Sequence, residues 1–177
     1  MRKTIAIIVL IITFFIIYFL QANFFSWFTI AGVKPNIFII LTLFISLFAG
    51  MKVGIPFAIV SGLFLDIIIG KSIGIYSIML GIIAVIGGYF DKNFSKESKL
   101  TIMLMVMGST CVFEIGHYII QIIQLSIEIE IIPFITTLLI EVIYNTILTI
   151  ILYPLIQKIG YKIEDIFKGQ KILTRYF

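Results

Sequence analysis

Residues 53–92 read VGIPFAIVSGLFLDIIIGKSIGIYSIMLGIIAVIGGYFDK and are the most informative part of the chain about its fold. It contains two apolar runs, separated at Gly70–Lys71–Ser72, and each has about the length that crosses a hydrocarbon core about 30 Å thick. Small residues recur at helical spacing along both runs. Burial of apolar surface contributes little to helix association in a membrane, so close packing through small residues takes its place. The stretch therefore predicts two membrane helices that pack against each other or against a partner.

The rest of the chain has the same character. Of its 177 residues, 61% are hydrophobic and 12% are charged, whereas about a quarter are charged in soluble proteins. We expect an all-α integral membrane protein with a six-helix transmembrane bundle. Its single domain, residues 1–157, has predicted spans at residues 4–20, 36–51, 53–70, 73–90, 100–124 and 134–157. Residues 158–177 are predicted to form a basic amphipathic cytoplasmic tail.

The link between the second and third predicted spans is very short. It consists of residues 50–54, with Gly50 and Gly54 at its ends, and glycine permits the backbone angles of a tight turn. A full helical hairpin and a re-entrant pair both fit this stretch.

The basic residues predict the orientation. Lys and Arg are enriched in cytoplasmic loops. With an inside amino terminus, eleven of the 13 basic residues lie on the cytoplasmic side, and only Lys34 and Lys71 lie outside. Both termini are therefore predicted to be cytoplasmic. The cations lie at the ends of apolar runs and form no single basic surface, so no nucleic-acid partner is expected.

Small residues define candidate surfaces for helix packing or partner binding. Gly54 and Gly62 share a face of the third span, which Asp66 continues, and Gly74 and Gly81 lie on a stripe of the fourth.

Polar residues inside the last two apolar runs predict a second feature. Glu114 and His117 share one side of the fifth span, and Glu141 and Asn145 share one side of the sixth. Charged groups in hydrocarbon are costly and usually face a bundle interior, a cavity or a partner. We expect a buried polar seam between these spans, with a structural or partner-binding role; an ion or proton path is the alternative.

Enzyme chemistry finds no support in the sequence. Glu114 and His117 have the E-x-x-H spacing of di-iron bundles, but such a site needs a second pair and the chain has one His. The lone Cys111 lacks the spacing of a metal site. We predict no catalytic residues, metal or cofactor.

Residues 32–91 carry a family resemblance. The stretch Gly32-Val33-Lys34-Pro35-Asn36 precedes an apolar run, and Gly62-Leu63-Phe64-Leu65-Asp66 ends the third span. This pattern resembles the MreD family of bacterial rod shape-determining proteins. The family-like residues are Pro35, Gly50, Gly62, Asp66 and Gly74.

The resemblance implies a nonenzymatic scaffold of the cell-elongation complex in the bacterial inner membrane. Such a protein would bind MreC and, through it, connect to MreB, RodA and a class B penicillin-binding protein in lateral peptidoglycan synthesis.

The competing interpretation is a substrate-binding subunit of an energy-coupling-factor vitamin transporter, because the MreD family resembles these six-helix subunits in fold. Those subunits present an Ala-x-x-x-Ala pattern in the first span, whereas Ala6 is followed four residues later by Leu10. An external ligand pocket would have to use Asp66, Glu141, Trp27 or the third external link. A small ion or proton transporter is a third class, supported by the buried carboxylates alone.

Overall fold

The computed structural model describes residues 2–69, 73–125 and 129–169, and the regular elements within these ranges are all helices. The elements are α1 (Arg2–Phe19), the π-helix η1 (Leu20–Phe24), α2 (Phe25–Trp27), α3 (Ile37–Ala49), α4 (Met51–Ile69), α5 (Ile75–Asn93), α6 (Lys99–Leu125) and α7 (Ile131–Lys168). The predicted all-α membrane protein is confirmed at this level. Five helical stretches are long and apolar enough to cross a membrane, α1 together with η1 and α2 counting as one.

Helix α3 is the exception among the long helices. Its 13 residues span about 20 Å at 1.5 Å per residue, which is less than the hydrocarbon thickness. All of them except Leu41 are buried. Helix α3 thus forms the centre of the bundle, against α4, α5 and α7, and protein surrounds most of its surface. The second predicted span is therefore a short helix inside the protein, and six complete crossings remain a prediction.

One residue joins α3 to α4. Gly50 has a φ of +83°, and its N–H donates to Ser46 O at 3.0 Å, which ends α3. Glycine adopts this left-handed conformation without steric cost, so α4 can start at the next residue.

Helices α4 and α5 pack directly against each other, and small residues make this possible. A Cβ atom added at Gly62 would lie 2.6 Å from Ser77 N and 2.7 Å from Tyr76 O. At Gly54 it would lie 2.6 Å from Ser46 Cα, in α3. Gly81 differs, because the nearest atom to its added Cβ would be Ile59 Cγ1 at 3.8 Å.

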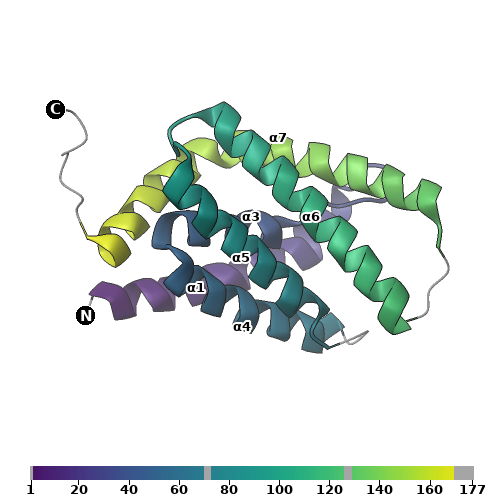
Figure 1. The fold of residues 1–177 in the computed structure, drawn as a ribbon, viewed down its shortest axis with the longest axis horizontal. Helices are drawn as coiled ribbons and strands as arrows, with labels where there is room; N and C mark the ends of the chain where they lie inside the picture. The colour runs from purple at the N-terminus through teal and green to yellow at the C-terminus, as the bar shows by residue number, and fades with distance from the viewer. Residues whose placement is uncertain (1, 70–72, 126–128, 170–177) are drawn as a thin grey trace.

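The start of α1 and the end of α7 lie at the same end of the bundle (Figure 1). We call this the terminal end, and it also holds the α5–α6 connection, residues 94–98. The opposite, distal end holds residues 28–36 and the start of α5. An even number of membrane crossings requires both termini on the same side of the membrane. The start of α1 and the end of α7 lie at one end of the bundle, as this requires. Which side is cytoplasmic remains a prediction.

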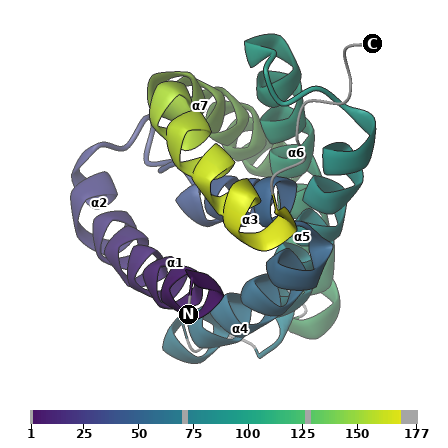
Figure 2. The same cartoon turned by 90° about the vertical axis from the view of Figure 1, so that its left-hand side faces the viewer.

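Helix α1 lies at the edge of the bundle, beside α4 (Figure 2). Only Ala6, Leu10 and Phe14 are buried along it. The Phe14 ring lies 5.6 Å from the rings of Phe38 and Phe64, so aromatic contacts hold α1 to the core.

Helix α7 continues past the predicted boundary between residues 157 and 158. It runs without interruption to Lys168 and ends at Gly169, whose φ is +75°. The first half of the predicted tail is therefore helical. Residues 170–177 of that tail, and the break at Gly70–Lys71–Ser72, lie outside the described residues.

Candidate binding site: a polar cavity at the distal end

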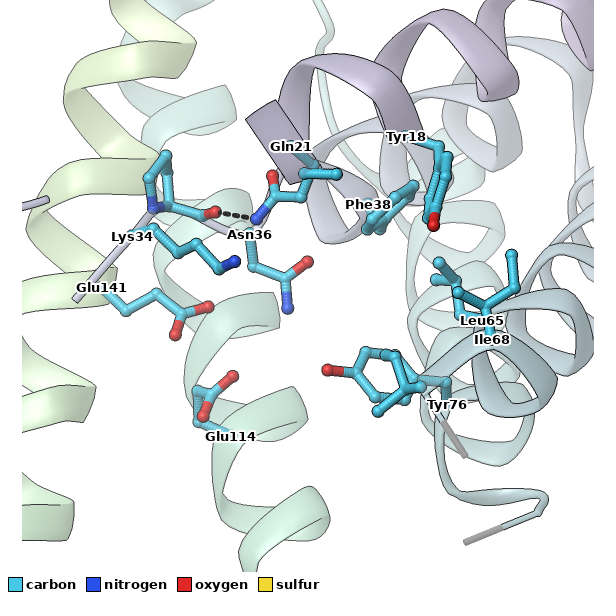
Figure 3. A pocket seen from close by; sticks show the side chains of 13 residues that line it. Tyr18, Gln21, Lys34, Asn36, Phe38, Leu65, Ile68, Tyr76, Glu114 and Glu141 are labelled. Carbon is cyan, nitrogen blue, oxygen red and sulfur yellow. Dashed lines mark hydrogen bonds between the residues drawn. The ribbon is translucent and has the colours of Figure 1, made fainter. Parts of the chain in front are cut away.

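A cavity of about 380 Å³ opens among the helices at the distal end. Its polar lining comes from five parts of the chain: Gln21, Lys34, Asn36, Tyr76, Glu114 and Glu141. Apolar side chains, among them Phe38, Leu65 and Ile68, complete the wall. We call this space the polar cavity (Figure 3).

The segment that leads into α3 forms one wall of the polar cavity, and the amide of Gln21 holds it in place. Gln21 Nε2 donates to Pro35 O at 2.6 Å, and Gln21 Oε1 accepts from Ile37 N at 3.3 Å. Pro35 itself has no N–H and is buried. Gln21 lies in η1, so the end of the first helical stretch positions the entrance to the central helix.

Asn145 fixes the same segment from the opposite side. It is fully buried, accepts a hydrogen bond from Asn36 N at 2.8 Å and donates to Thr110 Oγ1 at 3.1 Å. Three parts of the chain meet at one amide group, namely α7, α6 and the entrance to α3. This explains a polar residue in the middle of an apolar run, because Asn145 and Thr110 are both fully buried and need partners within the protein.

Two carboxyl groups point into the polar cavity. Figure 3 shows Glu114 from α6 and Glu141 from α7 directed toward the space around Asn36, where the Tyr76 hydroxyl and the Lys34 ammonium also point. Glu141 is only 6% exposed, and its Oε1 makes no hydrogen bond with any described residue. The buried Oδ1 of Asn36 likewise has no partner within the described ranges. Two buried acceptor atoms of the polar cavity thus have no donor among the described residues.

His117, the fourth residue of the predicted polar seam, lies outside the polar cavity. Its ring packs 5.2 Å from that of Tyr76 and 5.7 Å from that of Phe113, and Gln121 Nε2 lies 3.4 Å from its Nε2. It lines a neighbouring cavity of about 290 Å³, to which Glu114 also contributes. The structure thus brings Glu114 and Glu141 together and places His117 behind Tyr76.

Asp66 is occupied by the backbone of its own hairpin. Its carboxylate accepts hydrogen bonds from Gly74 N at 3.0 Å, Tyr76 N at 2.9 Å and Ser77 N at 3.1 Å, and the residue is 1% exposed. These N–H groups belong to the start of α5 and have no partner within that helix. Asp66 therefore links the end of α4 to the start of α5 and also neutralises the positive end of the helix dipole.

Sequence reasoning did not identify Tyr18, Gln21, Asn36 and Tyr76 as lining residues. Gln21 and Asn36 stand at the edges of apolar runs, where a polar residue indicates a boundary equally well. Tyr18 and Tyr76 read as ordinary apolar positions. The sequence therefore carries no local signal for these four lining residues.

A different polar group lies at the terminal end. Lys96 Nζ lies 2.6 Å from Asp91 Oδ1 and 2.6 Å from Glu164 Oε1, and Lys168 Nζ lies 2.7 Å from Asp91 Oδ2. We call these four residues the ionic cluster. Burial opposes the charged form of Lys96, but hydrogen bonds from its ammonium to Asp91 and Glu164 outweigh burial and raise its pKa. The ionic cluster thereby joins α5, the α5–α6 connection and the last turns of α7.

Comparison with known proteins identifies the family. The family model described as rod shape-determining protein MreD matches residues 1–162. No curated protein and no solved structure matches the chain, so the likeness to energy-coupling-factor transporter subunits stays a prediction. The match confirms the resemblance carried by residues 32–91 and extends it over most of the sequence. The chain belongs to the MreD family of rod shape-determining proteins and is a nonenzymatic, multi-pass membrane protein that serves cell shape.

Proposed function

We propose that this protein is a membrane scaffold of the cell-elongation complex that binds the membrane helix of MreC. Through MreC it would connect to MreB, RodA and a class B penicillin-binding protein. It would lie in the inner membrane with both termini in the cytoplasm, the orientation that the distribution of basic residues favours. Family membership supports the role in rod shape. The partners and the orientation are parts of the proposal.

A groove between α1 and α4 supports the contact with MreC. Its volume is about 450 Å³, and its wall is almost entirely apolar. The lining residues include Leu10 and Phe14 of α1 and Val53, Phe57, Val60 and Phe64 of α4. Helices in a membrane associate through shape-matched packing. A concave strip between two helices therefore suits a single added helix, which is what a bitopic partner offers.

The two faces of α4 have different contacts. Gly54 and Gly62 face α3 and α5, where an added Cβ would collide with neighbouring atoms. Val60 lies on the other face and is 70% exposed. The small residues predicted for packing or partner binding thus hold α4 in the bundle, and the larger apolar residues behind them form the groove.

Filling the groove tests this contact. The variant Val60→Trp places a large ring in the groove, and Ile151→Trp is the matched control, because Ile151 is 66% exposed on α7. We expect Val60→Trp to lower copurification with MreC about fivefold or more, the effect of about 1 kcal/mol of lost packing. Ile151→Trp should leave it unchanged.

The same pair gives a cellular test. After depletion of the native protein, the Ile151→Trp variant should restore rod-shaped cells, whereas Val60→Trp should leave rounded cells at equal protein level. Equal recovery of MreC with both variants would place the contact elsewhere on the molecule.

A further inference from the structure

The polar cavity contains acceptor atoms that the protein itself does not satisfy. Glu141 is only 6% exposed, and its Oε1 lacks a hydrogen-bond partner among the described residues. Asn36 Oδ1 is in the same condition, and both residues line the same space. A buried acceptor without a donor is costly, so a molecule that brings a donor into the cavity is stabilised there.

We propose that the polar cavity binds a small organic amine through its protonated ammonium group. The ammonium donates hydrogen bonds to the carboxyl group of Glu141, with the Asn36 carbonyl and the Glu114 carboxyl as further acceptors. A charged donor matches this site, because hydrogen bonds between ionised partners are roughly twice as strong as neutral ones.

The size and lining of the polar cavity suit an organic ligand better than a metal ion. A volume of about 380 Å³ is far larger than a single ion fills. In the part of the chain that the structure describes, no group of three His, Cys, Asp or Glu residues could hold a metal ion. The rings of Tyr18, Phe38 and Tyr76 line the same space. Aromatic faces attract cations, and the apolar wall accommodates a short hydrocarbon part.

Lys34 acts as a competitor within the site. Its ammonium points toward the same space in Figure 3, yet the residue is exposed and makes no ion pair with any described residue. Two carboxyl groups face this one flexible cation. An entering ammonium can therefore displace the Lys34 side chain into solvent. The amine can come from a soluble molecule or from the headgroup of an aminophospholipid, since both present the same primary ammonium.

The test is a calorimetric titration of the full chain in phosphatidylcholine nanodiscs with phenethylammonium chloride. Phosphatidylcholine carries a quaternary ammonium without N–H donors, so it does not imitate the proposed ligand. We expect saturable one-to-one binding, and no binding of the neutral alcohol phenethyl alcohol. Glu141→Gln should weaken binding about tenfold or more, as expected for loss of a hydrogen bond to a charged group. The matched control Glu97→Gln, an exposed residue of the α5–α6 connection, should bind as the unaltered chain does.

A second variant changes the affinity in the opposite direction and does not depend on a buried residue. Lys34→Met removes the competing ammonium and should strengthen binding severalfold. Weaker binding by this variant would mean that the Lys34 ammonium does not compete with the ligand, and would overturn the proposal. Absence of saturable binding to the unaltered chain, or equal binding by Glu141→Gln and Glu97→Gln, would also overturn it.

Nanodiscs that contain phosphatidylethanolamine distinguish the two sources of the amine. If the headgroup is the source, this lipid should compete and weaken binding of phenethylammonium. If a soluble amine is the source, the affinity should be the same in both membranes. None of these measurements involves MreC, so the result is independent of the proposed scaffold function.

Discussion

The two ends of the bundle use the same kinds of side chain in opposite ways. In the ionic cluster at the terminal end, Asp91 and Glu164 are matched by Lys96 and Lys168, and each charge has an oppositely charged neighbour within 3.4 Å. In the polar cavity at the distal end, two carboxyl groups face one exposed lysine, and one carboxylate oxygen has no partner among the described residues. Complete pairing indicates a structural role, whereas unpaired acceptors that line a cavity indicate a binding site. The hydrogen-bond partners of a buried carboxyl group, and not its burial alone, therefore distinguish a structural residue from a binding residue.

Asp66 gives the largest expected effect, because it is a distal carboxylate that is fully paired. Replacing it by Ala leaves three N–H groups at the start of α5 without an acceptor. We expect Asp66→Ala to lower the free energy of unfolding by about 3–5 kcal/mol, measured by denaturant titration in detergent micelles. The control is Asp165→Ala, an exposed position near the end of α7, with a change of about 0.5 kcal/mol or less.

A small effect of Asp66→Ala would break the comparison between the two ends. It would mean that pairing seen at the distal end does not contribute to stability, and Asp66 would then join Glu141 as a candidate binding residue.

Helices α4 and α5 pack closely in the middle of the bundle. Substitutions at two of their glycines test how much this packing contributes to stability. We expect Gly62→Ala to lower the free energy of unfolding by about 2–3 kcal/mol, because the new methyl group meets the backbone at Ser77 N and Tyr76 O. Gly81→Ala should be neutral or stabilise by about 0.5–1 kcal/mol, since its new methyl group makes only ordinary van der Waals contact with Ile59 and Ala favours the helix.

Thermal denaturation of the two glycine variants in the same detergent checks this difference. Equal melting temperatures would show that α4 and α5 can separate slightly at no cost, and the geometry of both ends would then be less strictly defined.

The order of the long apolar helices could be predicted from hydropathy, but η1, α2 and the buried position of α3 could not. Its sequence, IFIILTLFISLFA, is as apolar as that of a lipid-facing span. Lipid and protein interior are equally apolar, so hydropathy does not distinguish them. The predicted span, residues 36–51, exceeds α3 only by Asn36, Gly50 and Met51, so its length is close to that of the helix, but length alone does not show that protein surrounds it.

Two of the six polar lining residues could also be predicted. Glu114 and Glu141 were expected to meet in a polar seam, because charged groups in adjacent apolar runs usually face each other or a cavity. The contributions of Lys34, Asn36 and Tyr76 depend on how the entrance segment and α5 converge at the distal end. Pairing across long sequence distances has no local signature, and the same applies to the ion pair of Lys96 with Glu164 at the terminal end.

The last two variants compare the two ends of the bundle directly, because each replaces one carboxyl group by a neutral amide, Asp91→Asn at the terminal end and Glu141→Gln at the distal end. Asp91→Asn removes a carboxylate that binds Lys96 and Lys168 and leaves two ammonium groups beside the single carboxylate of Glu164. We expect it to lower the free energy of unfolding by about 2 kcal/mol, because the pairs are only partly buried. Glu141→Gln keeps the shape of the side chain and replaces a buried ionisable group by a neutral amide, so it should raise the same quantity by up to about 1 kcal/mol. Denaturant titrations without added amine measure both changes. A loss of stability with Glu141→Gln as large as that with Asp91→Asn would mean that Glu141 has a structural partner, and the two ends would then be built alike.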